Sequence, residues 1–450
     1  MRRFFAFDGR WMRGLWFVAL GALLSPSVAR CQDDAGPPPL YDSTRVVAEK
    51  EVEKYTNLYQ GQFTPGAGFD VIRTTRGTLN VSVYGLFRWI DQTPGDQSFT
   101  DHLGRPRTVK ARNDLNWHRT MIWLTGWFVD PKFRYNITSW SLASTEQTLL
   151  FGNLRYLYSE KLNFGVGISP NLTNRSLQGS WPFWAGSDRQ MAEEFLRGGF
   201  ASGFWITGRA YRSLYYTTSI DRSISQLGNT VADDNRDMSY SASFWTQPTT
   251  REYGPRGGFG DLEYHEKVAT QFGLSMASAR EGRYAPIDAP PKASQIKLSD
   301  SLNPFEASAF VDGVTVSKLT YQVLSFDAGM KYRGFSLQGE FSNRRLSNFA
   351  ATGPLPLSEV NDRGFFVEAM QMVVPRKLGI YGVTSYIDDD FNRHPYEVGG
   401  GASFYPYGNR QWRLNLHCMH VVKSPTASNF GYYSGGMTGT IFSLGTDILL

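Results

Sequence analysis

Hydrophobic and polar residues alternate one by one along much of the chain that follows residue 77. In the segment Thr78–Ile90, one face carries the apolar side chains of Leu79, Val81, Val83, Phe87 and Trp89. The other face carries Asn80, Ser82, Tyr84 and Arg88, with Leu86 as the one apolar exception. A period of two residues predicts a β-strand. Strands of soluble proteins average about five or six residues, whereas membrane-spanning strands need about 9–11, and this segment has the greater length.

The same alternation recurs further along the chain, and any charged residues fall on one face only. The opposite face is aliphatic or aromatic. The segments are 133–138, 163–168, 324–331, 335–342, 412–418 and 442–450. A barrel with lipid outside and water inside requires this division of side chains. A soluble sandwich with one solvated face would show it too, but with shorter strands.

The connections between the predicted strands are of two kinds. Tight turns are expected at 131–132, 159–161, 332–334, 375–377 and 407–410. Long polar segments are found at 91–113, 171–199, 222–238, 278–303, 347–363 and 424–436. Short turns at one end and long loops at the other are typical of a transmembrane barrel. The apolar runs from Leu79 onward number sixteen or seventeen, and because bacterial single-chain barrels have an even number, we predict an all-β antiparallel barrel of about 16 strands.

Residues 1–29 have the features of a secretory signal peptide. Arginines at positions 2, 3, 10 and 13 precede Leu15–Leu24, an apolar stretch too short to span a bilayer. Ser27 and Ala29 place small residues before a cleavage site. Two alternatives stay open: an uncleaved apolar tail, and a lipoprotein signal at Cys31, which Arg30 disfavours because a small residue is needed there.

Residues 30–62 are predicted to form a linker and a short periplasmic helix. The linker, Asp33–Leu40, is rich in proline, and Thr44–Tyr59 carries one apolar stripe at helical spacing. A helix of this length is marginal by itself, so we expect it to pack in a short coiled coil or plug the barrel, with a solvated arm as the alternative. Residues 63–450 are expected to form one outer-membrane β-barrel.

Composition supports this organisation. Aromatic residues make up 15% of the 450 residues, yet only 19% are charged and the mean hydropathy is −0.34. One apolar run approaches membrane-span length, which excludes a helical protein with several spans, and the aromatic content excludes disorder. The two cysteines, Cys31 and Cys418, exclude a disulfide scaffold. Removing residues 1–29 lowers the net charge from +5 to +2, so the basicity supports no nucleic-acid partner.

Four stretches resemble the phosphate-selective porin O/P family of Gram-negative outer membranes. GAGFDVIRTTRGTLNVSVYGLFRW is similar to the family's opening strand, and NLRYLYSEKLNFGVGISPN to the hairpin before its constriction loop. GFFVEAMQMVVPRKLGIYGVTSY and VGGGASFYPYGNRQWRLNLH resemble two late hairpins. The resemblance implies an outer-membrane barrel of sixteen strands, usually trimeric, with a loop folded into the pore. The family's phosphate ligands cannot be placed residue by residue.

The segment 171–199 occupies the position of that inward loop. Its charged residues are the candidates for the pore constriction: Arg175, Asp188, Arg189, Glu193, Glu194 and Arg197. Candidate cations of the lumen wall are Arg88, Arg134, Arg155, Lys331, Arg344 and Arg413, opposed by Asp327 and Glu340. Because cations replace the hydration shell of an anion, this set indicates a weakly anion-preferring channel. The alternative is an ordinary wet lumen whose cations are paired with carboxylates.

The segment 171–199 also carries Trp181, Phe183 and Trp184. These aromatic residues could contact sugars or aromatic solutes, or they could simply pack the loop against the wall.

Signals for catalysis are few. The chain has no GxSxG motif, and His265-Glu266-Lys267-Val268-Ala269 lacks the second histidine of HExxH. Asp261, Glu263 and His265 would share one face of a strand and could bind a metal or relay a proton, although a solvated mouth segment is the alternative. We predict a porin for passive diffusion of small hydrophilic solutes, with no enzyme activity, cofactor or metal. An all-β enzyme or binding protein with a site near Asp261, secreted or in the outer membrane, is the second hypothesis.

Overall fold

The computed structural model describes residues 66–142, 147–169, 172–175, 183–224, 237–251, 253, 260–283, 294–426 and 431–450. The predicted signal peptide and the predicted helix at Thr44–Tyr59 lie outside these residues. Among the described residues, no helix is both long enough and apolar enough to cross a membrane.

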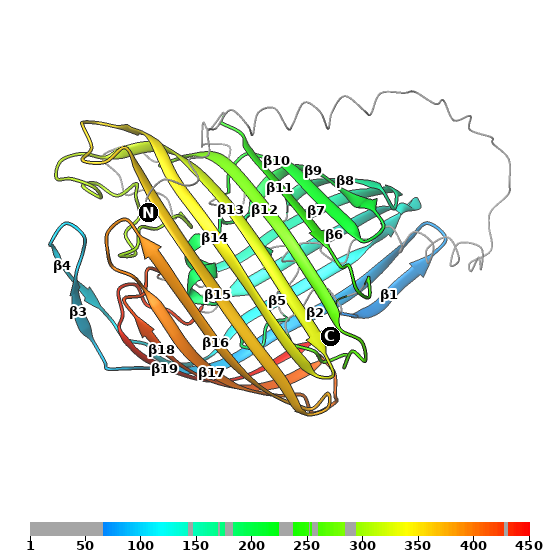
Figure 1. Ribbon diagram of the computed structural model, residues 1–450. Helices are drawn as coiled ribbons and strands as arrows, with labels where there is room; N and C mark the ends of the chain where they lie inside the picture. The colour runs from blue at the N-terminus through cyan, green and yellow to red at the C-terminus, as the bar shows by residue number, and fades with distance from the viewer. Residues whose placement is uncertain are drawn as a thin grey trace. The chain divides into compact units, whose positions relative to one another are not determined.

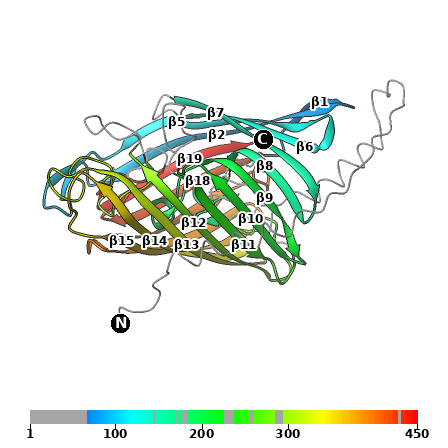
Figure 2. The same cartoon turned by 90° about the horizontal axis from the view of Figure 1, so that it is seen from above.

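Sixteen strands form one closed antiparallel sheet (Figure 1; Figure 2). They are β2 (Gly77–Thr93), β5 (Asn113–Phe128), β6 (Asp130–Leu142), β7 (Gln147–Ser159), β8 (Leu162–Ser169), β9 (Ala201–Tyr211), β10 (Leu214–Asp221), β11 (Ser239–Thr246), β12 (Ala269–Gly282), β13 (Val316–Tyr332), β14 (Phe335–Ala351), β15 (Glu359–Val374), β16 (Leu378–Asp389), β17 (Tyr396–Phe404), β18 (Trp412–Val422) and β19 (Gly439–Leu449). Each strand pairs with its neighbours in sequence, and β19 pairs with β2 to close the ring. The predicted all-β barrel of about 16 strands is confirmed.

A seventeenth strand of the same sheet, β1 (Phe69–Thr74), lies beside the start of β2. It pairs with the first residues of β2, just beyond the point where β19 stops. The carbonyl of Leu450 accepts hydrogen bonds from the Ser82 hydroxyl and, at 3.3 Å, from the Val83 amide. The Gly66 amide donates to the same Ser82 hydroxyl at 2.7 Å. Ser82 therefore joins both segments that flank β2.

The two ends of the barrel differ, as the connection lengths predict. The turns at 159–161, 332–334, 375–377 and 407–410 lie at the same end as Leu450, which we call the turn end. The first turn falls at Val129, not at 131–132, because Val129 has a positive φ of 63° and β6 already begins at Asp130. At the opposite end, the loop end, a hairpin of β3 (Gln97–Thr100) and β4 (Pro106–Val109) follows β2.

The predicted loop 347–363 is much shorter in the structure. Strand β14 extends to Ala351 and β15 begins at Glu359, because the paired register continues as far as Ser347 opposite Glu359. One connection at the turn end is long: residues 247–268, between β11 and β12.

The two faces of the wall are divided as the sequence predicts. Outward residues such as Phe326 and Leu416 are 50% and 55% exposed, whereas the intervening Ser325 and His417 are buried. Cys418 also faces outward. Ile168 is an exception, since it is buried beside Trp140 and Phe200. It follows Gly167, whose positive φ of 123° interrupts the alternation.

The outward apolar face gives a stability prediction. Leu416 lies in the middle of β18, so replacing it with arginine places a charge against the lipid chains. We expect Leu416→Arg to lower the free energy of unfolding by about 2–4 kcal/mol. The measurement is reversible urea unfolding in lipid vesicles. Tyr407→Arg, in an exposed turn, is the control and should change it by about 1 kcal/mol or less. Equal effects of the two changes would contradict the assigned lipid face.

Candidate functional site: the barrel interior

The described parts of the β8–β9 loop, residues 172–175 and 183–200, are almost entirely buried against inward-facing strand residues. The carbonyl of Ala185 accepts hydrogen bonds from Ser403 at 2.7 Å, from Arg413 at 3.1 Å and from Asn415 at 3.2 Å. Further along, the loop forms a short helix, α3 (Met191–Leu196). Tyr321 donates to the carbonyl of Leu196 at 2.6 Å, which holds the end of α3 against β13.

Asp188 is the centre of one cluster of charges. It accepts hydrogen bonds from Arg88 of β2 and, at 3.0 Å, from Arg119 of β5. A second guanidinium nitrogen of Arg88 lies 3.0 Å from His118 Nε2 and donates to the carbonyl of Gly431 at 3.1 Å. Two arginines from neighbouring strands thus converge on one loop carboxylate.

The hydrophobic pattern of the sequence does not reveal that Arg119 and His118 lie inside the barrel, and the reason is local. The β2–β5 register shifts by one residue, so that Leu86 faces Arg119 while Phe87 faces Trp117. His118 is the extra residue of this β-bulge, and both His118 and Arg119 are buried. A bulge breaks the period of two, which is the signal that would otherwise have placed Arg119 inside.

The remaining loop candidates surround α3. Arg197 pairs with Glu194 at 2.7 Å, and Arg189 lies 3.5 Å from Glu193 and 3.7 Å from Glu194. Burial raises the pKa of Glu193 to about 8, so this carboxyl is mostly neutral at pH 7. Burial would also raise the pKa of Glu194, but the adjacent Arg197 lowers it below its ordinary value. At the start of α3, the Met191 amide donates to the Glu397 carboxylate at 2.7 Å.

Arg175 lies apart from this group. Its backbone amide donates to Glu340 at 2.9 Å, and its guanidinium donates to Gln338 at 2.6 Å. Asp327 lies 3.8 Å away. The six predicted constriction residues are thus all buried, but Arg175 contacts the β13–β14 wall while Asp188 contacts the β2–β5 wall.

Three of the six predicted wall cations form close ion pairs. Arg88 pairs with Asp188, Arg344 pairs with Asp362 at 2.6 Å and lies over the Phe195 ring at 4.0 Å, and Arg413 pairs with Asp447 at 2.7 Å. Of the other three, Lys331 is 4.0 Å from Glu263, and Arg134 and Arg155 face each other across β6 and β7.

The prediction that six wall cations are opposed by only two carboxylates is wrong. Further buried carboxylates belong to the described strands: Asp221, Glu281, Asp362, Glu368, Glu397 and Asp447. Several of these carboxylates lie outside the alternating segments that the sequence identifies as strands. The wall as a whole is therefore not rich in cations, and pairing between opposite charges is common inside it.

Two tyrosines of the last loop also contact the β8–β9 loop. The Tyr432 hydroxyl accepts a hydrogen bond from the Ser187 amide at 2.8 Å. The Tyr433 hydroxyl donates to Glu397 at 2.7 Å and lies 3.2 Å from the Arg189 carbonyl. Sequence analysis missed both, because the loop that carries them has no periodic pattern.

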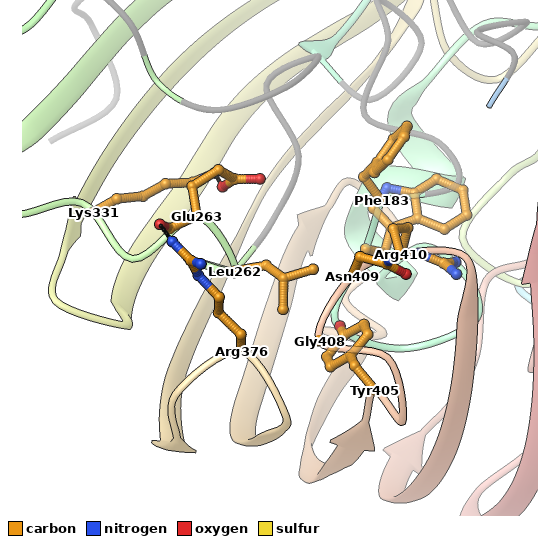
Figure 3. A pocket seen from close by; sticks show the side chains of 11 residues that line it. Phe183, Leu262, Glu263, Lys331, Arg376, Tyr405, Gly408, Asn409 and Arg410 are labelled. Atoms are coloured by element: carbon orange, nitrogen blue, oxygen red, sulfur yellow. Dashed lines mark hydrogen bonds and ion pairs between the residues drawn. The ribbon is translucent and has the colours of Figure 1, made fainter. Parts of the chain in front are cut away.

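Two of the cavities lined by described residues lie at opposite ends of the barrel. The loop-end cavity has a volume of about 370 Å³ and is lined in part by Arg107, Lys110, Arg112, Asp300 and Tyr433. The turn-end cavity has a volume of about 330 Å³ (Figure 3). It is lined by Phe183, Trp184, Gly260, Leu262, Glu263, Lys331, Arg376, Tyr405, Gly408, Asn409 and Arg410. Trp184 lines one cavity and Arg189 contacts a residue of the other, so the buried loop extends between them.

The Asp261, Glu263 and His265 side chains do come together, with ligand atoms within 4.8 Å of one another. The Asp261 carboxylate, however, accepts hydrogen bonds from the Gly334 amide at 2.7 Å, from the His265 amide at 3.1 Å and from the His265 ring. Burial opposes ionisation of Asp261, but these hydrogen bonds, led by that of His265, lower its pKa. These contacts indicate a structural role for Asp261, which links the long β11–β12 connection to the β13–β14 turn.

No family model and no curated protein matches this chain. Among solved structures, outer-membrane expressed OmpT of Vibrio cholerae is 10% identical, with a TM-score of 0.51, covering 85% of this chain and 100% of that one. The anion-selective porin of Comamonas acidovorans is 9% identical (TM-score 0.47; 83% and 100% covered), and the channel DcaP of Acinetobacter baumannii is 10% identical (TM-score 0.45; 85% and 100% covered). The resemblance to phosphate-selective porins stays a prediction, and the likeness to OmpT gives this chain the fold of an outer-membrane β-barrel.

Proposed function

We propose that this protein is an outer-membrane porin through which small hydrophilic solutes diffuse passively. The observation that carries the proposal is the closed sixteen-stranded wall, apolar outside and polar inside, with a cavity at each end. A closed sheet satisfies every backbone group without an exposed edge, as a lipid environment requires. The hydrogen bonds of Asp261 indicate a structural role, so we do not propose catalysis there.

We further propose that residues 171–199 form the constriction of the pore. Support comes from the described part of this segment, which is buried and hydrogen-bonded to β2, β5, β14 and β18. Asp188 and α3 hold it to opposite walls of the ring, so that it divides the interior. A solute passing through would have to travel beside this segment.

The preference for anions, in this proposal, is set at the mouths of the pore. Ion pairing cancels much of the charge in the middle of the barrel. At the loop-end cavity, Arg107 shares the Asp101 carboxylate with Arg105, and Arg112 pairs with Asp114 at 3.0 Å, whereas Lys110 is exposed. The Asp300 carboxylate of the same cavity accepts hydrogen bonds from the backbone amide and the ring of His102. Unbalanced charge at the entrance of a low-dielectric channel concentrates counter-ions there. The preference is therefore for anions and is weak.

This preference can be measured by the reversal potential in planar bilayers. We expect the purified protein to conduct, with chloride more permeant than potassium. Arg107→Gln combined with Lys110→Gln should lower the permeability ratio by about twofold or less at 0.1 M salt, and more at 0.01 M, where the Debye length is about 30 Å. Lys423→Gln, an exposed lysine outside that cavity, is the control. Absence of conductance would refute the porin proposal, and cation selectivity would refute the preference.

The pKa of Glu193 predicts how selectivity depends on pH. Below about pH 8 the carboxyl is neutral, and above it the carboxylate adds a negative charge inside the barrel. The anion preference should therefore fall as the pH rises from 6 to 9.5, with a midpoint near 8. Glu193→Gln should flatten this profile, whereas Glu266→Gln, at an exposed position, should leave it unchanged.

The same ionisation affects stability in a defined direction. The folded state holds the Glu193 proton up to about pH 8, whereas an unfolded glutamate loses it near 4.5. The folded state thus binds more protons in this window, and the contribution of Glu193 to the free energy of unfolding must decrease as the pH rises from 4.5 to 8. A Glu193→Gln variant that kept the same slope would show that other groups cause it.

We also propose a homotrimer in the outer membrane, exported through the predicted cleavable signal peptide. This assembly follows from the family resemblance. Sedimentation of the detergent-solubilised protein should give three copies per particle, and a monomer would contradict the proposal. Mass spectrometry of the mature chain should place its first residue at Arg30.

A further inference from the structure

The turn-end cavity combines an aromatic wall with a set of cations. Phe183 and Trp184 come from the β8–β9 loop, and Tyr405 comes from the β17–β18 turn. Trp184 and Tyr405 are buried, and the Arg189 guanidinium lies 4.7 Å from the centre of the Trp184 ring. In Figure 3, Phe183, Tyr405 and Arg410 lie across the cavity from Lys331 and Arg376. The apolar and cationic groups therefore face the same space.

The cations of this cavity are only partly balanced by carboxylates. Asp447 is shared between Arg410, which lines the cavity, and Arg413 behind it. Lys331 lies 4.0 Å from the Glu263 carboxylate. Arg376 donates to the backbone carbonyl of Glu263 at 3.3 Å, which leaves its charge uncompensated by that contact. Among the described residues that line the cavity, three cations, Lys331, Arg376 and Arg410, accompany one carboxylate, Glu263.

Aromatic and charged groups in one small cavity define a class of ligand. Flat apolar surfaces favour a ring by stacked or edge-to-face contact, and guanidinium groups bind a carboxylate through paired hydrogen bonds. A volume of about 330 Å³ is near the lower limit of about 300–1,000 Å³ for ligand pockets, so the ligand is small. Inorganic phosphate would use the cations but would leave the aromatic wall without a partner.

We propose that the turn-end cavity is a binding subsite for small aromatic carboxylates. The inference rests on the proposed porin function, since it requires solutes to enter the barrel. The carboxylate pairs with Arg376 and Lys331, and the ring packs on Phe183 and Tyr405. Such a subsite would hold an aromatic acid briefly at the turn-end mouth.

Binding is tested first without any measurement of transport. Benzoate is titrated into the detergent-solubilised full-length protein and followed by ligand-observed NMR. We expect benzoate to bind at least tenfold more tightly than acetate, which has no ring, or benzamide, which has no charge. Arg376→Gln should weaken benzoate binding about fivefold, the effect of about 1 kcal/mol for an exposed ion pair. Phe183→Leu should weaken the binding of benzoate but not the binding of acetate.

The matched control is Arg333→Gln, which removes an exposed arginine from the neighbouring β13–β14 turn, outside the cavity lining. This change should leave benzoate binding unaltered. Equal binding of benzoate and acetate, or equal effects of the two arginine changes, would overturn the inference. Tighter binding of phosphate than benzoate, unaffected by Phe183→Leu, would also overturn it and would identify an inorganic anion site.

A second measurement separates this inference from the porin proposal. In planar bilayers, benzoate added on the turn-end side should reduce the chloride current with only a shallow dependence on voltage, because the cavity lies at that mouth. Conductance without any reduction by benzoate would refute the subsite and leave the porin proposal intact. Benzoate binding in detergent without conductance would support the subsite while refuting the porin proposal.

Discussion

The closure of the sheet on itself is the constraint on which the rest of this structure depends. Lipid offers no hydrogen-bond partners, so each backbone amide and carbonyl of the wall must pair with a neighbouring strand. The β19–β2 pairing supplies the last of these partners, and Ser82 and Leu450 extend the bonding to the end of the chain. Once the ring is closed, alternate residues have only two environments. Lipid contact selects aromatic and aliphatic side chains outside, and the polar residues must lie within.

The many polar side chains that face the interior must then find hydrogen-bond or ion-pair partners. The described part of the β8–β9 loop provides such partners by exchanging hydrogen bonds with several strands. Its carbonyls accept from Arg344 and Arg413, while its Asp188 accepts from Arg88 and Arg119. Removing one partner from such a buried pair would leave an uncompensated charge, which typically costs about 3–5 kcal/mol. The contacts that position the loop are therefore the same contacts that stabilise the buried charges of the wall.

The wall could be predicted from the sequence because lipid and protein interior make opposite demands on alternate residues. Arg88, Arg344 and Arg413 were assigned to the inner face from the period of two alone, and they are buried there. The same signal failed at His118, where a bulge adds one residue and hides Arg119. It could not identify Tyr432 or Tyr433, which belong to a loop and reach the interior through tertiary contacts. The predicted excess of cations on the inner wall was wrong for a related reason. Buried carboxylates such as Glu397 are held by partners that are distant in sequence, in this case the Met191 amide.

This distribution of charge explains why selectivity would depend on the ends of the barrel. A charge in the middle is close to a partner of opposite sign, as in the Arg344–Asp362 pair at 2.6 Å, and the field of such a pair falls off steeply with distance. A charge at a mouth, such as that of Lys110 or Arg376, is exposed and acts on ions that approach from solution. It is also screened by salt over about 8–10 Å at physiological concentrations. Strong selectivity would need unpaired cations in the proposed constriction, where Arg197 is paired with Glu194 and two arginines contact Asp188. The proposed weak, salt-dependent preference would thus be the physical consequence of a loop held in place by ion pairs.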